Sequence, residues 1–191
     1  MAFQESPKPP KSVQREAVMD RKRRPLLAVI GDASVAEEDP RYVAARALGR
    51  LAVDANFRLV TGGCGGVMEA ASRGAHESER YQEGDVIGIL PGPDDAKANP
   101  WVDIALPTGL GHMRNGLVAR ADVVVAVGGG AGTLNEMTFA WMHRRPLVAL
   151  DVGIGWSSEM GGRILDARQD QPIQRATRPE EAIEMGLRLL P

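Results

Sequence analysis

The sequence predicts an α/β fold, a doubly wound and mostly parallel sheet with helices on both faces, formed by a single domain. Short apolar runs rich in β-branched residues alternate with helical patterns along the chain, and this alternation is typical of parallel strands joined by right-handed crossovers. Two glycine-rich turns, 61–66 and 128–133, each stand where a strand runs into a helix. The run 123–127 is apolar at every position, as expected of an interior strand buried on both faces.

The expected elements follow one another from residue 25 onward. Asp39 is a suitable N-cap for a helix with Pro40 in its first turn. Residues 151–162 are rich in glycine and serine, so we expect a surface loop there. Strands are expected over 26–30, 57–61, 85–90, 103–106, 123–127 and 146–150, with weaker signals over 163–167 and 173–175. Helices are expected over 40–55, 67–77, 134–143 and 179–190, with a further helix ending near residue 121.

Residues 1–24 differ in composition from the rest. Prolines stand among lysines and arginines, a helical stretch is conceivable around 13–20, and four basic residues end the segment at 21–24. The basic run could contact nucleic acid, but a solvated lead-in to the first strand is the favoured interpretation. We therefore expect a flexible basic, proline-rich tail over 1–24 and one domain over 25–191.

Composition narrows the class of protein. The chain has 191 residues, enough for one domain with a full-sized core, and its net charge of -2 argues against a broad surface for nucleic acid. Its single cysteine, Cys64, excludes an internal disulfide and suits a reducing compartment. No apolar stretch is long enough to span a bilayer, and the first residues lack a secretion signal. We expect a cytoplasmic protein without a membrane partner.

The glycine turns predict a phosphate site. Glycines after a strand let backbone N–H groups approach an anion that also interacts with the positive end of the next helix. The common signatures are missing, however. Residues 31–34 read GDAS after the first strand, Thr133 stands where the third glycine of a dinucleotide fingerprint belongs, and no Gly-Lys-Ser/Thr occurs. We therefore expect a phosphorylated small molecule, and neither NAD nor a P-loop nucleotide.

Three segments resemble motifs of a known superfamily. Residues 128–136 read GGGAGTLNE, similar to the Pro-Gly-Gly-x-Gly-Thr-x-x-Glu motif of the lonely-guy (LOG) proteins, with Gly128 in place of proline. Residues 61–70 read TGGCGGVMEA and residues 109–115 read GLGHMRN, which resemble two motifs of the molybdenum cofactor carrier-like branch. The resemblance covers 26–190 and implies a Rossmann-like nucleotide-binding domain closest to the carrier branch.

The resemblance implies two activities. Carrier proteins bind the molybdenum cofactor (molybdopterin), whose terminal phosphate would occupy the glycine-rich cradle, so we expect this cofactor, or a nucleotide, as bound cargo. LOG enzymes are phosphoribohydrolases that cleave the base–ribose bond of a nucleoside 5′-monophosphate. In that alternative Glu136 and Arg114 would be catalytic. Gly128 in place of proline and Asn115 in place of lysine favour the carrier branch, and whether the protein is an enzyme stays open.

Glu136 and Arg114 each allow a second interpretation. The spacing of Thr133 and Glu136 fits a capping box, in which Glu136 would bond back to the backbone of Thr133 rather than face a ligand. Arg114 could be a surface arginine in an ion pair. The resemblance favours ligand contact for both. The expected ligand-binding residues are Gly62, Gly63, Gly65, Gly66, Arg114, Asn115, Gly129, Gly130, Gly132, Thr133 and Glu136.

Other candidates are weaker. Cys64 is better explained as a small residue in a tight bend than as a reactive thiol, whereas His112 and Asp32 could line the cleft. His76 and His143 lack the spacing of metal ligands, so we expect no metal held by the protein. The helix expected over 134–143 is apolar around much of its girth, which predicts a homodimer or homotetramer.

Overall fold

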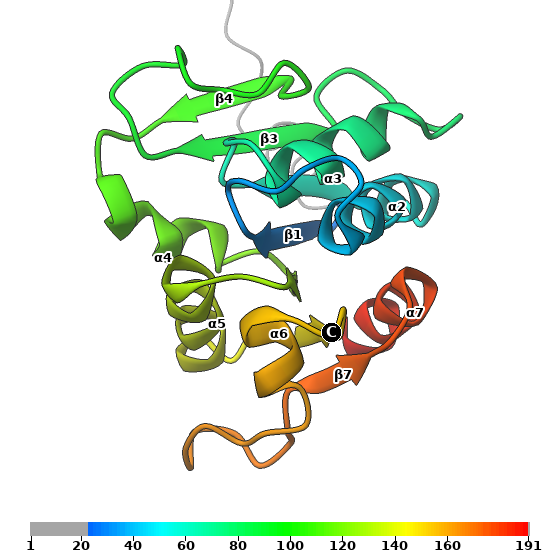
Figure 1. Cartoon of the computed structure of the whole chain (residues 1–191), viewed down its shortest axis with the longest axis vertical. Helices are drawn as coiled ribbons and strands as arrows, with labels where there is room; N and C mark the ends of the chain where they lie inside the picture. The colour runs from blue at the N-terminus through cyan, green and yellow to red at the C-terminus, as the bar shows by residue number, and fades with distance from the viewer. Residues whose placement is uncertain (1–22, 191) are drawn as a thin grey trace, which may run out of the picture.

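A computed structural model describes residues 23–190, which form one α/β unit around a single sheet (Figure 1). The sheet has seven strands in the order β4-β3-β2-β1-β5-β6-β7, and every neighbouring pair is parallel. The strands are β1 Leu26–Gly31, β2 Arg58–Thr61, β3 Val86–Leu90, β4 Ile104–Pro107, β5 Val123–Val127, β6 Leu147–Leu150 and β7 Gln174–Ala176. The predicted doubly wound, Rossmann-like fold is confirmed.

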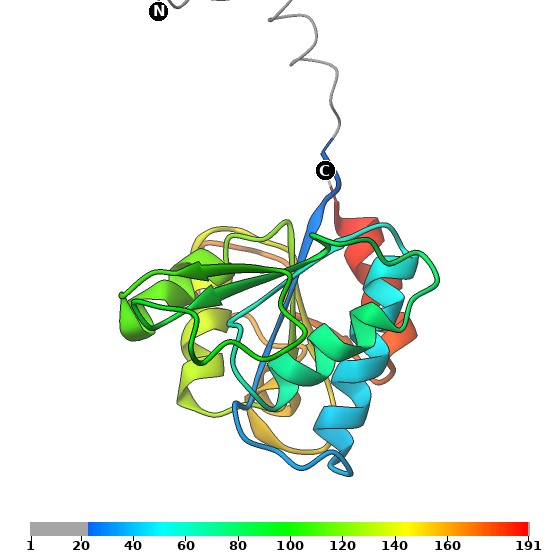
Figure 2. The ribbon, with the colours of Figure 1, turned by 90° about the horizontal axis from the view of Figure 1, so that it is seen from above.

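Helices cover both faces of the sheet (Figure 2). The described helices are α2 Pro40–Asp54, α3 Val67–His76, η1 Gly111–Arg114, α4 Asn115–Val118, α5 Ala131–Met142, α6 Gly155–Met160 and α7 Pro179–Leu189. Helices α2, α3 and α7 pack on one face and α4 and α5 on the other, as the two core clusters show. None of the helices in this part of the chain is long and apolar enough to cross a membrane.

The alternation of side chains along β1 builds both cores. Leu27 and Val29 join the cluster beneath α2, α3 and α7, whereas Ala28 and Ile30 join the cluster beneath α4 and α5. All four side chains are at most 1% exposed. The same argument predicted that 123–127 is an interior strand, and β5 does lie between β1 and β6 with all five residues buried.

Helix α2 begins where the sequence predicts. Asp39 accepts a hydrogen bond from the backbone N–H of Arg41 at 2.9 Å, and Pro40 occupies the first turn. This contact satisfies one of the donors that a helix start leaves free. The N-cap prediction is therefore confirmed.

Two ion pairs attach the first described residues to the domain. Arg23 forms two hydrogen bonds with Asp122, at 2.6 and 2.7 Å, and Arg24 pairs with the buried carboxylate of Asp85. The last two residues assigned to the tail thus contact the amino-terminal side of the sheet. The helical stretch expected around 13–20 lies outside the described residues.

Two local predictions are wrong. Residues 151–162 are not only a loop, because they contain helix α6, and residues 163–167 are irregular and form no strand. Helix α6 is fixed by tertiary contacts: the N–H groups of Trp156 and Ser157 donate to the carbonyls of Gly129 and Gly128. These contacts join segments that are far apart in the sequence, so no local pattern reports them.

Candidate functional site

The candidate site lies where the direction of the winding changes. Strands β1 and β5 are neighbours, but the chain continues from β1 toward β2 and from β5 toward β6. Ligands of such sheets bind in the crevice at the carboxyl ends of the two strands. A cavity of about 260 Å³, here called the main chamber, is found there. Its lining residues are Gly31, Asp32, Ala33, Met68, His112, Arg114, Asn115, Gly130, Gly132, Thr133 and Glu136.

The first glycine turn, 61–66, supports the chamber without lining it. A Cβ on Gly62 would lie 2.3 Å from a guanidinium nitrogen of Arg114, and a Cβ on Gly63 would lie 2.5 Å from Leu90. Gly66 has a φ of 64°, and its Cβ would lie 2.4 Å from the carbonyl oxygen of Asp32. The glycines of this turn therefore permit close packing against Arg114, β3 and the end of β1.

Asn99 holds the first turn in place from outside. Its side-chain amide donates to the carbonyls of Gly63 and Cys64, at 3.2 and 2.9 Å. Cys64 is half-buried, and its thiol lies 3.5 Å from the carbonyl oxygen of Gly62. The thiol thus packs within the bend and does not line the main chamber.

The second glycine turn is shaped by positive backbone angles. Gly128 has a φ of 61° and Gly129 a φ of 97°, which proline at position 128 could not reproduce, because its ring fixes φ near −65°. A Cβ on Gly128 would also lie 2.5 Å from the Arg41 side chain. A proline at this position, as in the LOG motif, would therefore require a different backbone conformation.

Asp32 occupies part of the expected cradle. Its Oδ2 accepts hydrogen bonds from the N–H of Gly129 at 2.8 Å and from the Arg41 guanidinium at 3.0 Å. The N–H of Gly128 donates to Ser157 on α6. Both N–H groups at the start of the turn are thus already engaged within the protein, and the binding role expected for Gly129 would require displacing Asp32.

The amino-terminal end of α5 remains open to the main chamber. Gly130 is the N-cap and makes no side-chain capping contact, and the first hydrogen bond of the helix runs from Leu134 N–H to Gly130 C=O. The N–H groups of Ala131, Gly132 and Thr133 precede that bond and have no partner within the helix. A Cβ on Gly130 or Gly132 would meet no atom within 4 Å. Here the backbone offers donors and the positive helix end to an anion.

Arg114 and Glu136 form a buried ion pair beside that helix end. Their Nη1 and Oε1 atoms are 2.8 Å apart, and the two residues are only 8% and 6% exposed. The capping-box interpretation of Glu136 is wrong, because α5 begins at Ala131 and Glu136 bonds to Arg114 instead. The interpretation of Arg114 as a surface arginine is also wrong. Its Nε is buried and has no hydrogen-bond partner among the described residues.

Burial makes Glu136 a proton-exchanging group near neutral pH. Loss of hydration raises the pKa of its carboxyl to about 7, although the charge and the hydrogen bond of Arg114 act in the opposite direction. A carboxylic acid in a cleft with such a pKa can both bind polar groups and transfer a proton. Glu136 is therefore a candidate for ligand binding or proton transfer in the main chamber.

The structure brings most of the predicted residues together and separates some. Of the predicted residues, the main chamber is lined by Asp32, His112, Arg114, Asn115, Gly130, Gly132, Thr133 and Glu136. It is not lined by Gly62, Gly63, Gly65, Gly66 or Gly129. Met68, which sequence reasoning did not select, also lines it. Between residues 23 and 190, no three His, Cys, Asp or Glu side chains gather as metal ligands would.

Fold and site together define a class: a Rossmann-like α/β domain whose cleft lies at the strand-order switch, beside an open helix start. Comparison with known families identifies the family within this class. The model of the SLOG cluster4 family matches residues 24–183, and the chain belongs to this family. The resemblance inferred from the glycine turns is confirmed.

Solved structures extend the comparison. The molybdenum cofactor binding protein of Rippkaea orientalis is 35% identical, with a TM-score of 0.73, covering 86% of this chain and 96% of that one. The molybdenum cofactor carrier protein of Chlamydomonas reinhardtii is also 35% identical, with a TM-score of 0.72 and coverage of 87% and 98%. The DNA processing protein A of Helicobacter pylori, at 18% identity and a TM-score of 0.60, shares the fold alone.

Two curated proteins are similar in sequence. An uncharacterised protein of Archaeoglobus fulgidus is 35% identical over 125 residues, which cover 65% of this chain and 78% of that one. The cytokinin riboside 5′-monophosphate phosphoribohydrolase LOG of rice is 32% identical over 120 residues, which cover 57% of this chain and 48% of the enzyme. The chain is thus similar to both branches named by the sequence resemblance.

Proposed function

We propose that the protein binds and carries a phosphorylated heterocyclic ligand, with the molybdenum cofactor as its cargo. The observation that carries this proposal is the open start of α5 within the same chamber as the buried Arg114–Glu136 pair. The two similar solved proteins whose names refer to the molybdenum cofactor, at 35% identity over nearly their whole length, support the choice of cargo.

In this proposal the phosphate of the ligand lies at the start of α5. The unpaired N–H groups of Ala131, Gly132 and Thr133 would donate to its oxygens, and the Thr133 hydroxyl could add a further donor. Compared with the sequence expectation, this set of donors adds Ala131 and leaves out Gly129, whose N–H already donates to Asp32.

Arg114 would stabilise the ligand's negative charge or bind its polar edge. Nη1 is committed to Glu136, whereas the buried Nε lacks a partner among the described residues. A buried donor without an acceptor lowers stability, so a ligand atom that accepts a hydrogen bond from Nε would stabilise the complex. Glu136 in turn holds the guanidinium in one orientation.

A second function is favoured by the pKa of Glu136. A carboxyl that titrates near pH 7 in a ligand cleft could bind ribose hydroxyls and assist water attack on a developing oxocarbenium ion. The reaction would be hydrolysis of the base–ribose bond of a nucleoside 5′-monophosphate, which yields the free base and ribose 5-phosphate. The similarity to the rice LOG enzyme supports this alternative.

One experiment separates the two functions. The protein is incubated with AMP, and free adenine and ribose 5-phosphate are measured; in parallel, binding of molybdopterin is measured by calorimetry. No release together with tight molybdopterin binding is the result expected of a carrier. Release that is lost in Glu136→Gln, but kept in the matched control Glu77→Gln on the exposed Arg46–Glu77 pair, would establish the hydrolase instead.

We further propose that a second copy of the chain packs against exposed apolar residues of α4 and α5 that do not line the cleft. Leu117 on α4 and Met142 at the end of α5 are 47% and 44% exposed, and unpartnered apolar side chains on neighbouring helices favour association. The expected assembly is a homodimer or homotetramer. Light scattering at micromolar concentration tests it, and a monomeric mass would contradict it.

A further inference from the structure

The cleft continues past the main chamber into a second cavity of about 390 Å³, here called the side chamber. His112, Asn115 and Gly132 line both cavities, so the two adjoin. Gly132 has no side chain, and a Cβ there would meet nothing within 4 Å, so no side chain of this residue separates the two cavities beside the start of α5. A ligand whose phosphate rests at that helix start could therefore extend into the side chamber.

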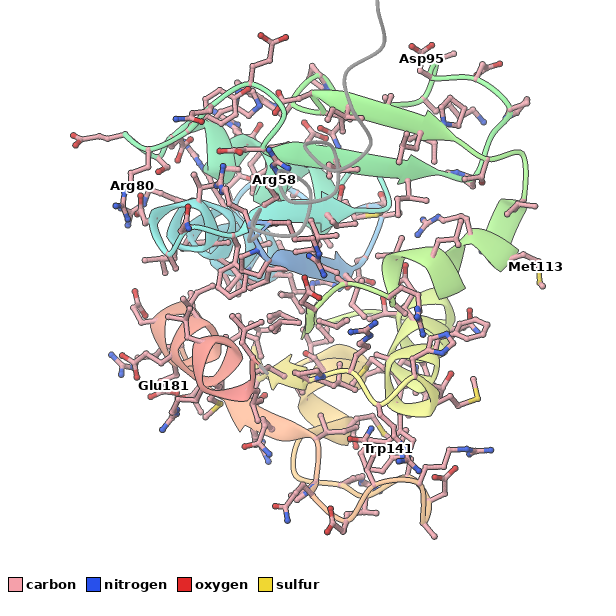
Figure 3. All side chains as sticks on the ribbon, turned by 180° about the vertical axis from the view of Figure 1, so that it is seen from behind. Arg58, Arg80, Asp95, Met113, Trp141 and Glu181 are labelled. Atoms are coloured by element: carbon pink, nitrogen blue, oxygen red, sulfur yellow. The ribbon has the colours of Figure 1, made fainter. Side chains whose placement is uncertain are left out.

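The two chambers differ in chemical character. The main chamber contains the charged groups of Asp32, Arg114 and Glu136. The side chamber is walled instead by apolar groups of Met113 and Phe139, with no charged Asp, Glu, Arg or Lys among its lining residues. Met113 is 74% exposed, and Figure 3 shows its side chain projecting outward from the ribbon. An exposed methionine and an aromatic ring suit the faces of a flat, polarisable ring system.

Two side-chain amides, those of Asn115 and Asn135, also line the side chamber. Asn115 is only 3% exposed, and its Nδ2 donates to Oδ1 of Asn135 at 2.9 Å. No hydrogen bond between described residues uses Oδ1 of Asn115 or Nδ2 of Asn135. The pair thus presents one free acceptor and one free donor group side by side. An accessible amide oxygen that accepts no hydrogen bond within the described residues is free to accept one from a ligand.

We propose that the side chamber binds the planar nitrogen heterocycle of the phosphorylated ligand and that Asn115 and Asn135 recognise its hydrogen-bonding edge. This inference rests on the proposed function, which places the phosphate at the start of α5. Pterins and purines carry a donor and an acceptor along one edge, which matches the free groups of the amide pair. A sugar phosphate without a heterocyclic base would fill the main chamber alone.

The inference predicts that the side chamber distinguishes ligands with a planar heterocyclic ring from those without one. Molybdopterin, AMP and GMP serve as the probes that carry such a ring (the ring-bearing probes) and ribose 5-phosphate as the probe without a base, with dissociation constants measured by calorimetry. Met113→Ala and Asn135→Ala alter exposed residues, so both should fold. Each should weaken the best-bound ring-bearing probe about tenfold or more, as loss of one good contact does. Binding of ribose 5-phosphate should stay unchanged.

Two positions outside the cleft, the exposed Leu187 and the half-buried Gln174, provide matched controls. Leu187→Ala on α7 removes a similar apolar surface, and Gln174→Ala on β7 removes an amide. Neither should change the binding of any probe. If the wild-type protein binds ring-bearing probes and the two side-chamber variants bind them equally well, the inference is wrong while the proposed function stands. If the wild-type protein binds none of the probes, both are overturned.

Discussion

The two glycine turns look alike in sequence and lie at the same edge of the sheet, but their surroundings are opposite. In the first turn, Gly62 and Gly66 are buried and a Cβ on either would clash with Arg114 or with backbone of the β1 end. In the second, Gly130 and Gly132 are exposed and a Cβ on either would meet nothing within 4 Å. The first turn is therefore a packing element, and the second opens into the cleft.

This difference shows what a glycine-rich motif can and cannot indicate. A run of glycines predicts that a backbone must come close to something, but the partner can be a ligand or another part of the protein. In the first turn the partner is Arg114, whose guanidinium packs directly against Gly62. The first turn thus serves the site indirectly, by positioning a residue that lines the main chamber.

Gly66→Ala should cause the largest loss of stability. Gly66 has a φ of 64°, and its added Cβ would lie 2.4 Å from the Asp32 carbonyl oxygen and 2.7 Å from a carbon of Ala33. Because these atoms belong to the backbone, they cannot move aside cheaply. We expect a loss of about 3 kcal/mol or more in the free energy of unfolding, measured by denaturant titration. Gly65→Ala, whose nearest atom is 3.1 Å away, should cost clearly less, and equal losses would refute the packing role.

Glu136, on the helix that follows the second turn, should make stability depend on pH. Its pKa is raised from 4.5 to about 7 in the folded protein, so the folded state holds this proton more tightly than the unfolded state. The contribution is greatest below pH 4.5 and is lost as the pH rises toward and through 7. At about 1.4 kcal/mol per pKa unit, it amounts to roughly 3 kcal/mol.

Glu136→Gln should remove this pH dependence, because the amide does not titrate and still offers an oxygen to Arg114. The free energy of unfolding, measured by denaturant titration from pH 5 to 8, should fall with rising pH more steeply in the wild-type protein than in the variant. Glu77→Gln, at an exposed pair, should follow the wild-type profile. Parallel profiles for wild type and Glu136→Gln would show that the carboxyl titrates near its ordinary pKa.

Gly62→Ala should affect binding more than stability. The added methyl group would press on the tip of the Arg114 guanidinium, 2.3 Å from one nitrogen, and an arginine tip can shift where backbone cannot. We expect a stability loss of about 1–2 kcal/mol and at least tenfold weaker binding of molybdopterin in calorimetry. Gly92→Ala, with its nearest atom at 3.7 Å, is the control. Unchanged binding in Gly62→Ala would show that Arg114 does not depend on the first turn.

Local patterns predicted the order of the main strands and helices, because the signal for each element lies within a short stretch of sequence. Asp39 before Pro40 located the start of α2, and the apolar run 123–127 located β5. The predicted start of α5 is three residues too late, because Gly130 and not Thr133 is the N-cap. With the helix starting earlier, the spacing of Thr133 and Glu136 no longer describes a capping box.

The features that sequence could not predict depend on contacts between distant segments. Asp32 reaches the N–H of Gly129 only because β1 and β5 pair in register from Leu27 with Val123 to Gly31 with Val127. The unfilled hydrogen bonds of Asn115 and Asn135 likewise require α4 and α5 to lie side by side. Motif resemblance drew attention to the segment around the start of α5, but the distribution of free donors there is a property of the fold.

Gly132→Ala should produce the smallest change in stability, with the opposite sign to the first-turn variants. Gly132 lies in the first turn of α5 with nothing near its missing Cβ, so alanine should raise the free energy of unfolding by up to about 1 kcal/mol through its higher helix propensity. The same methyl group would stand where the two chambers adjoin and beside the proposed phosphate position. Binding of molybdopterin and AMP should therefore weaken while thermal stability holds or improves. A stable variant that binds as the wild type does would mean that the ligand does not approach this helix start, which would remove the distinction drawn between the two turns.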